Sequence, residues 1–173
     1  MLRLVKPSVK YKKSFLDDYL THDEMQESYE MAGMPKTDVP KHFNEFAKRL
    51  RGQAEGKYLK LGYIPQSVYW LVDGKKFLGK TDIRHYLNAH LKKIGGHIGY
   101  YISPSERQKG YGKAILKLAL RKAKALGIKN ALITCDITNF GSKRIIEANG
   151  GKFVSAVRMG KGLPKKLRYN IKL

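Results

Sequence analysis

The residues from Arg107 to Gly112, Arg-Gln-Lys-Gly-Tyr-Gly, lie between an apolar stretch at 97–102 and an amphipathic stretch at 113–126. This arrangement predicts a tight turn that joins a strand to a helix. Glycines allow a ligand to approach the backbone closely, and the first amides of a helix have no partner within the helix. An anion can bind at such a turn, and we therefore expect a phosphorylated cofactor there.

The neighbouring side chains distinguish three kinds of phosphate-binding turn. A P-loop has Ser or Thr after its lysine, to hold magnesium, but Ala114 follows Lys113. A dinucleotide-binding turn has a third glycine, and Ile115 occupies that position. The remaining pattern, Arg-x-x-Gly-x-Gly, resembles the pyrophosphate loop of the GNAT family of N-acetyltransferases, which bind acetyl-coenzyme A (acetyl-CoA).

A second segment supports this resemblance. Residues 139–151 read Asn-Phe-Gly-Ser-Lys-Arg-Ile-Ile-Glu-Ala-Asn-Gly-Gly, and they resemble the second cofactor helix of the family. We expect Asn139 to cap this helix, Ser142 to stand where the family has a small residue, and Gly150 to end it. The segments Arg-His-x-Leu-Asn at 84–88 and Gly-Gly-His-Ile-Gly-Tyr at 95–100 are similar to those of some bacterial GNAT proteins.

The resemblance, which covers about residues 67–173 by motif and the first 66 by element order, implies an α/β (α+β) fold with a mixed, splayed central sheet and helices on both faces. A length of 173 residues predicts one domain over residues 1–173. The resemblance also implies acetyl-CoA as the acetyl donor. The backbone of Tyr101, Ile102 and Ser103 would pair with the pantetheine arm, which Asn139 would also contact. The other residues implied to hold the cofactor are Arg107, Gln108, Lys109, Gly110, Tyr111, Gly112, Lys113, Ala114, Ser142 and Lys143.

Acetyl transfer from a thioester to an amine needs a polarised carbonyl group and an amine without its extra proton. By the resemblance, the amide of Ile102 would donate to the developing oxyanion, a contribution of about 10²–10³ in rate. The family often has a tyrosine that protonates the leaving thiolate, but Ile146 stands at that position. Either another phenol, such as Tyr101 or Tyr111, donates this proton, or the thiolate leaves unassisted.

Other side chains are candidates for the base and for contact with the acceptor. His97 is the first candidate for the base because imidazole titrates near neutral pH, and Asp82 and Glu106 follow. Arg84 and His85 are expected at the acceptor site, where the guanidinium group of Arg84 could bind a carboxylate through two hydrogen bonds. The alternatives are a packed, structural His97 and an Arg84 that pairs with Asp82.

Charge suggests the kind of acceptor. The chain has 35 Lys or Arg against 14 Asp or Glu, a net charge of +21, and residues 61–173 carry +18 of it. Such a field attracts anions, unless it reflects only dispersed, solvated lysines. We predict acetylation of a small anionic or zwitterionic amine by a monomer or homodimer. The alternatives are a basic nucleic-acid- or ribosome-associated binding module and a protein N-terminal or lysine acetyltransferase.

Composition excludes several other classes of protein. No stretch reaches 18 uncharged apolar residues and no apolar signal segment is present, so we expect a cytoplasmic protein with no membrane partner. The single cysteine, Cys135, permits no internal disulfide and is expected in the core. The five histidines show no metal-ligand spacing, so no metal site is predicted.

Hydrophobic periodicity predicts the elements that position these residues. Strands are expected at 2–5, 67–72, 77–83, 97–102, 131–137 and 167–173, and helices at about 8–20, 38–50, 113–126 and 139–150. Asp73 and Gly74 predict a tight hairpin between the second and third strands. The polar segment at 84–93 is expected to be a connection with helical character.

Overall fold

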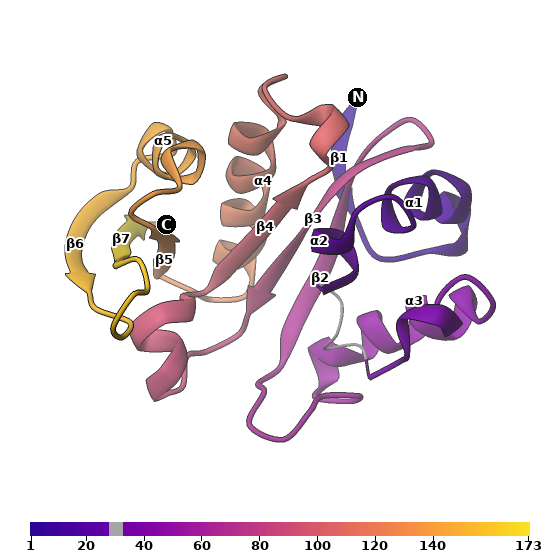
Figure 1. Ribbon diagram of the computed structural model, residues 1–173, viewed down its shortest axis with the longest axis horizontal. Coiled ribbons are helices and arrows are strands. Elements are labelled where there is room, and N and C mark those ends of the chain that lie inside the picture. Colours follow the sequence, from indigo (N-terminus) through magenta and orange to yellow (C-terminus); the bar gives the residue numbers. More distant parts are fainter. Residues whose placement is uncertain (28–32) are drawn as a thin grey trace.

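The computed structural model describes residues 1–27 and 33–173, which form two antiparallel sheets with helices packed against them (Figure 1). The strands are β1 (Leu2–Val5), β2 (Gln66–Asp73), β3 (Lys76–Arg84), β4 (Ile98–Ile102), β5 (Asn130–Asp136), β6 (Lys152–Val157) and β7 (Lys166–Lys172). The α-helices are α1 (Lys12–Tyr19), α2 (Asp23–Glu27), α3 (Phe43–Gly52), α4 (Tyr111–Ala125) and α5 (Phe140–Ala148). Short 3-10 turns occupy Val9–Tyr11, Lys36–Asp38, Gln53–Glu55 and Pro104–Glu106, and a π-helical turn occupies Leu91–Gly95.

The first sheet has the strand order β1-β2-β3-β4, and the second has the order β5-β7-β6. The hairpin between β2 and β3 turns at Gly74, whose φ of 57° is readily adopted by glycine. In β7, the apolar residues that alternate with polar ones, Leu167, Tyr169 and Ile171, are buried, as their spacing predicts.

Helices cover both faces of the first sheet, which confirms the predicted fold class. On one face, α1 and α3 pack an aromatic core in which the rings of Phe15 and Trp70 stack with their centroids 4.7 Å apart. On the other face, the apolar side of α4 packs against Ile83 of β3 and the buried residues of β5 and β7. The outer side of α4 is left to solvent.

The two sheets meet beside His97, just before β4. The amide of His97 donates to the carbonyl of Leu132 in β5 at 2.6 Å. No ladder of paired residues joins β4 to β5 among the described strands, which are paired only within their own sheets. This is the splayed arrangement that the resemblance implied.

Two elements of the described chain are not in the prediction. The short helix α2 lies beyond the helix that was expected at 8–20. β6 was not predicted, because most of its side chains are exposed and no alternation of apolar and polar residues marks it. The polar connection after β3 is irregular at 85–88 and helical at 89–95, so it has the helical character that was expected. Within the described residues, no helix has the length and apolar character needed to cross a membrane.

Candidate active site

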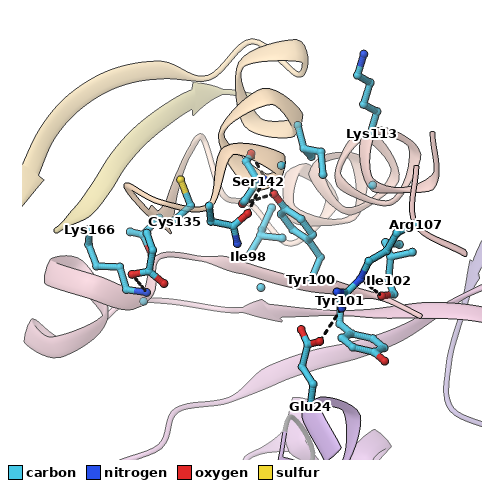
Figure 2. Close-up of a pocket in the computed structure, with 18 of the residues that line it drawn as sticks. Glu24, Ile98, Tyr100, Tyr101, Ile102, Arg107, Lys113, Cys135, Ser142 and Lys166 are labelled. Atoms are coloured by element: carbon cyan, nitrogen blue, oxygen red, sulfur yellow. Dashed lines mark hydrogen bonds and ion pairs between the residues drawn. The ribbon is translucent and has the colours of Figure 1, made fainter. Parts of the chain in front are cut away.

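A cavity of about 890 Å³ lies between β4 and β5, at the start of α4 and α5 (Figure 2). Glu24 of α2 and Arg84 of β3 also contribute to its wall. The predicted site residues that line it are Arg84, Tyr101, Ile102, Arg107, Gln108, Gly110, Gly112, Lys113, Asn139 and Ser142. The fold therefore brings the two predicted cofactor motifs to one cavity.

The turn before α4 has a backbone suited to an anion. Gln108 and Gly110 both adopt left-handed conformations, with φ of 64° and 83°. Such residues within a turn direct neighbouring amides to one side. Gly110 is the N-cap of α4 and supplies no side-chain cap, so the first amides of the helix remain available to a ligand. The strained conformation of Gln108 is of the kind that is found at binding sites.

Gly112 has a structural role that its sequence position did not reveal. A Cβ atom at this residue would lie 2.4 Å from Cδ1 of Ile145 on α5. Glycine therefore allows α4 and α5 to pack closely beside the cavity. The sequence predicts that this glycine makes room for a phosphate, but the helix contact alone explains its lack of a side chain.

Five residues that were predicted to hold the cofactor do not line the cavity, namely Ser103, Lys109, Tyr111, Ala114 and Lys143. The amide of Ala114 donates to the carbonyl of Gly110 at 3.2 Å, within the first helical turn. The ammonium group of Lys109 pairs with Glu106 at 3.1 Å. Tyr111 packs at the edge of an apolar cluster, and Lys143 lies on α5 outside the lining.

Hydrogen bonds at the end of β4 occupy the backbone of Ser103. Its amide donates to the carbonyl of Leu78 at 3.0 Å, and its carbonyl accepts from the amide of Glu106 at 2.8 Å. The prediction that this backbone pairs with the pantetheine arm is therefore wrong. The hydroxyl of Ser103 is also engaged, because it donates to the buried carboxylate of Asp18.

Strand register then decides which backbone groups of β4 face the second sheet. In an antiparallel strand the backbone groups of successive residues point to opposite edges. The backbone N–H and C=O groups of Tyr101 and Ser103 point to β3. The backbone groups of Tyr100 and Ile102 point to the opposite, free edge of β4. The carbonyl of Ile102 accepts from Nε of Arg107 at 3.1 Å on this edge.

The phenol of Tyr100 crosses the gap between the two sheets. Its hydroxyl lies 2.7 Å from the hydroxyl of Ser142, at the start of α5, and Figure 2 shows both side chains in the cavity wall. Burial raises the pKa of Tyr100 to about 12. Ile146, at the position of the family tyrosine, is fully buried in the core and cannot reach the cavity. Sequence reasoning considered Tyr101 and Tyr111 but missed Tyr100.

Asn139 performs the predicted capping role. Its side-chain oxygen accepts from the amide of Ser142 at 2.9 Å, and Asn139 also lines the cavity. The cap fixes the first turn of α5, and this turn carries Ser142 toward Tyr100.

Arg107 is held by protein groups on three sides. Besides the Ile102 carbonyl, its guanidinium group pairs with Glu24 at 2.7 Å and lies 5.7 Å from the ring centre of Tyr101. Figure 2 shows the ion pair at the wall of the cavity. The pair links α2 to the turn before α4, a contact between distant segments that the sequence did not predict.

His97 lies between the two sheets and not in the cavity lining. Its Nδ1 accepts a hydrogen bond from the amide of Leu132 at 2.9 Å. Burial, with a smaller contribution from the charge of Arg84, lowers the pKa of His97. The structure therefore gives His97 the structural role, and it does not bring the predicted base to the site.

The other predicted acid–base residues are also engaged elsewhere. Asp82 pairs with Lys80 at 2.9 Å in a buried ion pair, and Glu106 pairs with both Lys76 and Lys109. Neither carboxylate lines the cavity. His85 bonds through Nε2 to the hydroxyl of Ser67 at 2.9 Å, also outside the lining.

Arg84 does reach the cavity. One nitrogen of its guanidinium group donates to the carbonyls of Gly95 and Gly96, at 3.3 and 3.1 Å. These bonds orient the side chain. Among the described residues, no carboxylate lies close enough to the guanidinium group of Arg84, within 4.0 Å, to form an ion pair with it. The alternative of a direct pair with Asp82 is therefore not the arrangement found.

Two carboxylates of the described residues line the cavity, and each has a cationic partner. Glu24 pairs with Arg107, while Asp136 pairs with Lys166 at 2.7 Å. Cys135 is buried, as predicted, but it also lines the cavity, and burial raises the pKa of its thiol. No group of His, Cys, Asp and Glu within the described part of the chain could hold a metal ion.

Solved structures share this fold. A microcin C7 self-immunity acetyltransferase, MccE, solved with acetyl-CoA and AMP, is 14% identical with a TM-score of 0.67, over 99% of this chain and 92% of that one. An acetyltransferase from Salmonella typhimurium that modifies the N-terminal serine of ribosomal protein L7/L12 is 14% identical with a TM-score of 0.65, over 99% and 95%. A GNAT-family acetyltransferase from Bacillus anthracis is 16% identical with a TM-score of 0.63, over 99% and 94%.

The family is established by sequence. A comparison with curated proteins gave no match. The profile of the acetyltransferase (GNAT) domain, in contrast, matches residues 2–152, most of the chain. The chain therefore belongs to the GNAT family of acetyltransferases, which use acetyl-CoA as the acetyl donor.

Proposed function

We propose that this enzyme transfers the acetyl group of acetyl-CoA directly to the amine of a small acceptor that carries a carboxylate or phosphate group. The observation that carries the proposal is the shared cavity, which is lined both by the glycine-containing turn before α4 and by Arg84. The turn would hold the donor, and Arg84 would hold the acceptor.

The residues of the turn fit the phosphate groups of the donor. Backbone amides from Gln108 to Lys113 and the ammonium group of Lys113 would bind them, with help from the positive end of the α4 dipole. Bound acetyl-CoA supplies a thioester, an activated acyl group that an amine can attack. Arg107 would meet a phosphate only by exchanging its bond to Glu24.

The free edge of β4 would stabilise the charge that develops on the acyl oxygen. The amides of Tyr100 and Ile102 point to this edge, and an oxyanion donor of this kind contributes about 10²–10³ in rate. The hydroxyl of Tyr100 would donate a proton to the departing thiolate, since its raised pKa keeps the proton in place at neutral pH. Among the described residues, the carboxylates available to receive the proton of the amine are those of Glu24 and Asp136.

The cofactor site can be tested by charge reversal at two ends of one helix. Lys113→Glu places a negative charge in the cavity wall, whereas Lys124→Glu makes the same change on the same helix, about 16 Å away. We expect Lys113→Glu to weaken acetyl-CoA binding at least about tenfold by calorimetry, because one charge-assisted contact contributes about 1.5–3 kcal/mol. Lys124→Glu should keep the wild-type Kd, and equal affinity in all three proteins would place the donor elsewhere.

The acceptor proposal predicts a preference for the carboxylate group that depends on Arg84. We expect the wild-type enzyme to acetylate free amino acids better than the corresponding amino acid amides, with free thiol release as the measurement. In Arg84→Ala this preference should be lost through a KM raised about 10- to 100-fold, and Arg84→Lys should restore part of it. Polyamines that turn over faster than amino acids, with no penalty in Arg84→Ala, would show that the acceptor is not anionic.

A further inference from the structure

The positive charge of this protein is concentrated in the part of the chain that follows β4. Residues 107–173 contain 17 Lys or Arg, and their only acidic residues are Asp136 and Glu147. Asp136 is paired with Lys166, and Glu147 accepts from the hydroxyl of Tyr169 at 3.3 Å. This half of the molecule therefore has almost no carboxylates with which to balance its cations.

One helix arranges part of this charge in a row. Lys113, Lys117, Arg121 and Lys124 are exposed on α4, at intervals of four, four and three residues. Residues at these intervals lie on one side of an α-helix, about 6 Å apart along its axis. The opposite side of α4 is buried in the core, so the row faces solvent along the helix. We call Lys117, Arg121 and Lys124 the α4 row, since Lys113 belongs to the cavity.

The α4 row has no balancing charge. No carboxylate of the described residues lies within 4.0 Å of its cations. Like charges at i and i+4 destabilise a helix by about 0.2–0.5 kcal/mol for each pair. The row also lies outside the cavity wall, so binding of acetyl-CoA does not account for it.

The chemistry of the row indicates the kind of partner. A membrane-surface helix needs an exposed apolar side, but the apolar side of α4 is buried. Protein interfaces are centred on apolar and aromatic side chains, whereas the large exposed aromatic residues of this half, Phe140 and Phe153, lie on α5 and β6. The α4 row has only one large exposed apolar residue beside it in the described chain, Leu126 at the end of the helix, and such a row of cations suits a phosphate backbone, which Lys and Arg bind without reading the bases.

We propose that the α4 row docks the phosphate backbone of a nucleic acid, without sequence preference, while the cavity stays open to its substrates. This inference does not rest on the proposed acceptor. It assigns to the catalytic domain a second surface that would hold the enzyme on a polyanion during turnover.

Fluorescence anisotropy with labelled nucleic acid tests this surface. The probes are an RNA duplex, a single-stranded RNA and a DNA duplex of equal length, each titrated with the full-length protein over a series of salt concentrations. We expect binding whose logarithm falls linearly with the logarithm of salt concentration. In Lys117→Gln/Arg121→Gln/Lys124→Gln, affinity should fall at least about tenfold, and the salt slope should become shallower by about 3, one for each lost cation.

A matched variant removes the same net charge from other exposed positions. Lys13→Gln/Lys41→Gln/Lys60→Gln changes three exposed lysines that precede β2 in the chain. This protein should bind each probe within about twofold of wild type. Both triple variants should keep the wild-type Kd for acetyl-CoA, which separates the α4 row from the cofactor site, and Arg121→Gln alone should show a partial effect if the triple variant does not fold.

The remaining outcomes would overturn the proposal. Equal losses in the two triple variants would mean that only net charge matters, and an unchanged α4-row variant would exclude the row. Binding of polyglutamate or of phosphatidylserine vesicles as tight as that of nucleic acid would point to a different class of partner. Among supporting results, the ranking of the three probes would distinguish RNA from DNA and duplex from single strand.

Discussion

At the scale of single residues, Tyr100 and Tyr101 show what sequence reasoning could and could not decide. Alternation along a strand requires that their side chains point to opposite faces of the sheet. It does not say which one reaches Ser142 and which one reaches the buried Asp18, as Tyr101 does at 3.3 Å. The decision depends on the register of β4, which is fixed by pairing with residues of β3 that lie 15 or more positions earlier in the chain.

Removal of the Tyr100 hydroxyl should affect the chemical step. We expect Tyr100→Phe to lower kcat about 10- to 100-fold, because general acid catalysis is lost while the ring still fills its space. Since the pKa of Tyr100 is about 12, the wild-type rate should show no alkaline decline from this group up to about pH 10. Steady-state measurement of free thiol release gives kcat and its pH dependence.

The neighbouring phenol is the matched control. Tyr101→Phe removes a hydroxyl that bonds to Asp18, so it should lower the melting temperature but leave kcat nearly unchanged. If Tyr101→Phe lowers kcat more than Tyr100→Phe does, the proton donor has been assigned to the wrong tyrosine.

Most of the predicted site residues that line the cavity have a backbone conformation or a capping role that is specified by residues close to them in the sequence. Gly110 is needed for a left-handed turn, and Asn139 is needed for a cap. Both demands arise within a few residues, and the sequence therefore predicted them. The contact of Glu24 with Arg107 and the placement of His97 join distant segments, and no local pattern specifies them.

At the scale of elements, the junction of the two sheets depends on a histidine side chain. The imidazole of His97 accepts from the amide of Leu132 while its own amide donates to the carbonyl of that residue. Nδ1 can accept only in the neutral ring. Protonation of His97 would place a second donor against the Leu132 amide and break this part of the junction.

The junction should therefore weaken in acid. The pKa of folded His97 is lowered from 6.5, mainly by burial, so the unfolded chain binds the proton more readily. Its contribution to stability is complete above about pH 6.5 and is lost as the pH falls through the folded pKa. Urea unfolding at pH 7.5 and 5.5 should show this loss in wild type, and His97→Gln, which can accept but not titrate, should reduce it.

His85 provides the comparison for that experiment, because burial also lowers its pKa but its ring bonds to the hydroxyl of Ser67 in β2 and not to the second sheet. In His85→Gln, the free energy of unfolding should still fall between pH 7.5 and pH 5.5 by the amount that comes from the junction at His97. An unaltered pH dependence in His97→Gln would remove the junction as its source. Folded His97→Gln should also keep its kcat, since the ring does not line the cavity.

At the scale of the whole molecule, charge and fold have different effects. The fold could be predicted from periodicity and two motifs, but the +21 charge says nothing about topology. The net charge instead predicts that the cations of the folded protein repel one another. We expect the melting temperature to rise by several degrees between low salt and about 0.3 M NaCl, because a Debye length of about 10 Å at 0.1 M already screens distant charges.

A charge variant provides the control for this measurement. The triple variant Lys13→Gln/Lys41→Gln/Lys60→Gln has a lower net charge and should show a smaller rise with salt. A melting temperature that does not change with salt in wild type would mean that repulsion contributes little to stability.

The edge strand β6 gives the same charge a second consequence. β6 is the last strand of its sheet, and Phe153 and Val154 are exposed on it. An open edge with apolar side chains is where molecules can join edge to edge and precipitate. Lys152 lies at one end of β6 and Arg158 directly follows the other, and cations at such an edge keep copies apart. Added salt should therefore raise the melting temperature of the folded protein and at the same time promote its aggregation through the edge of β6.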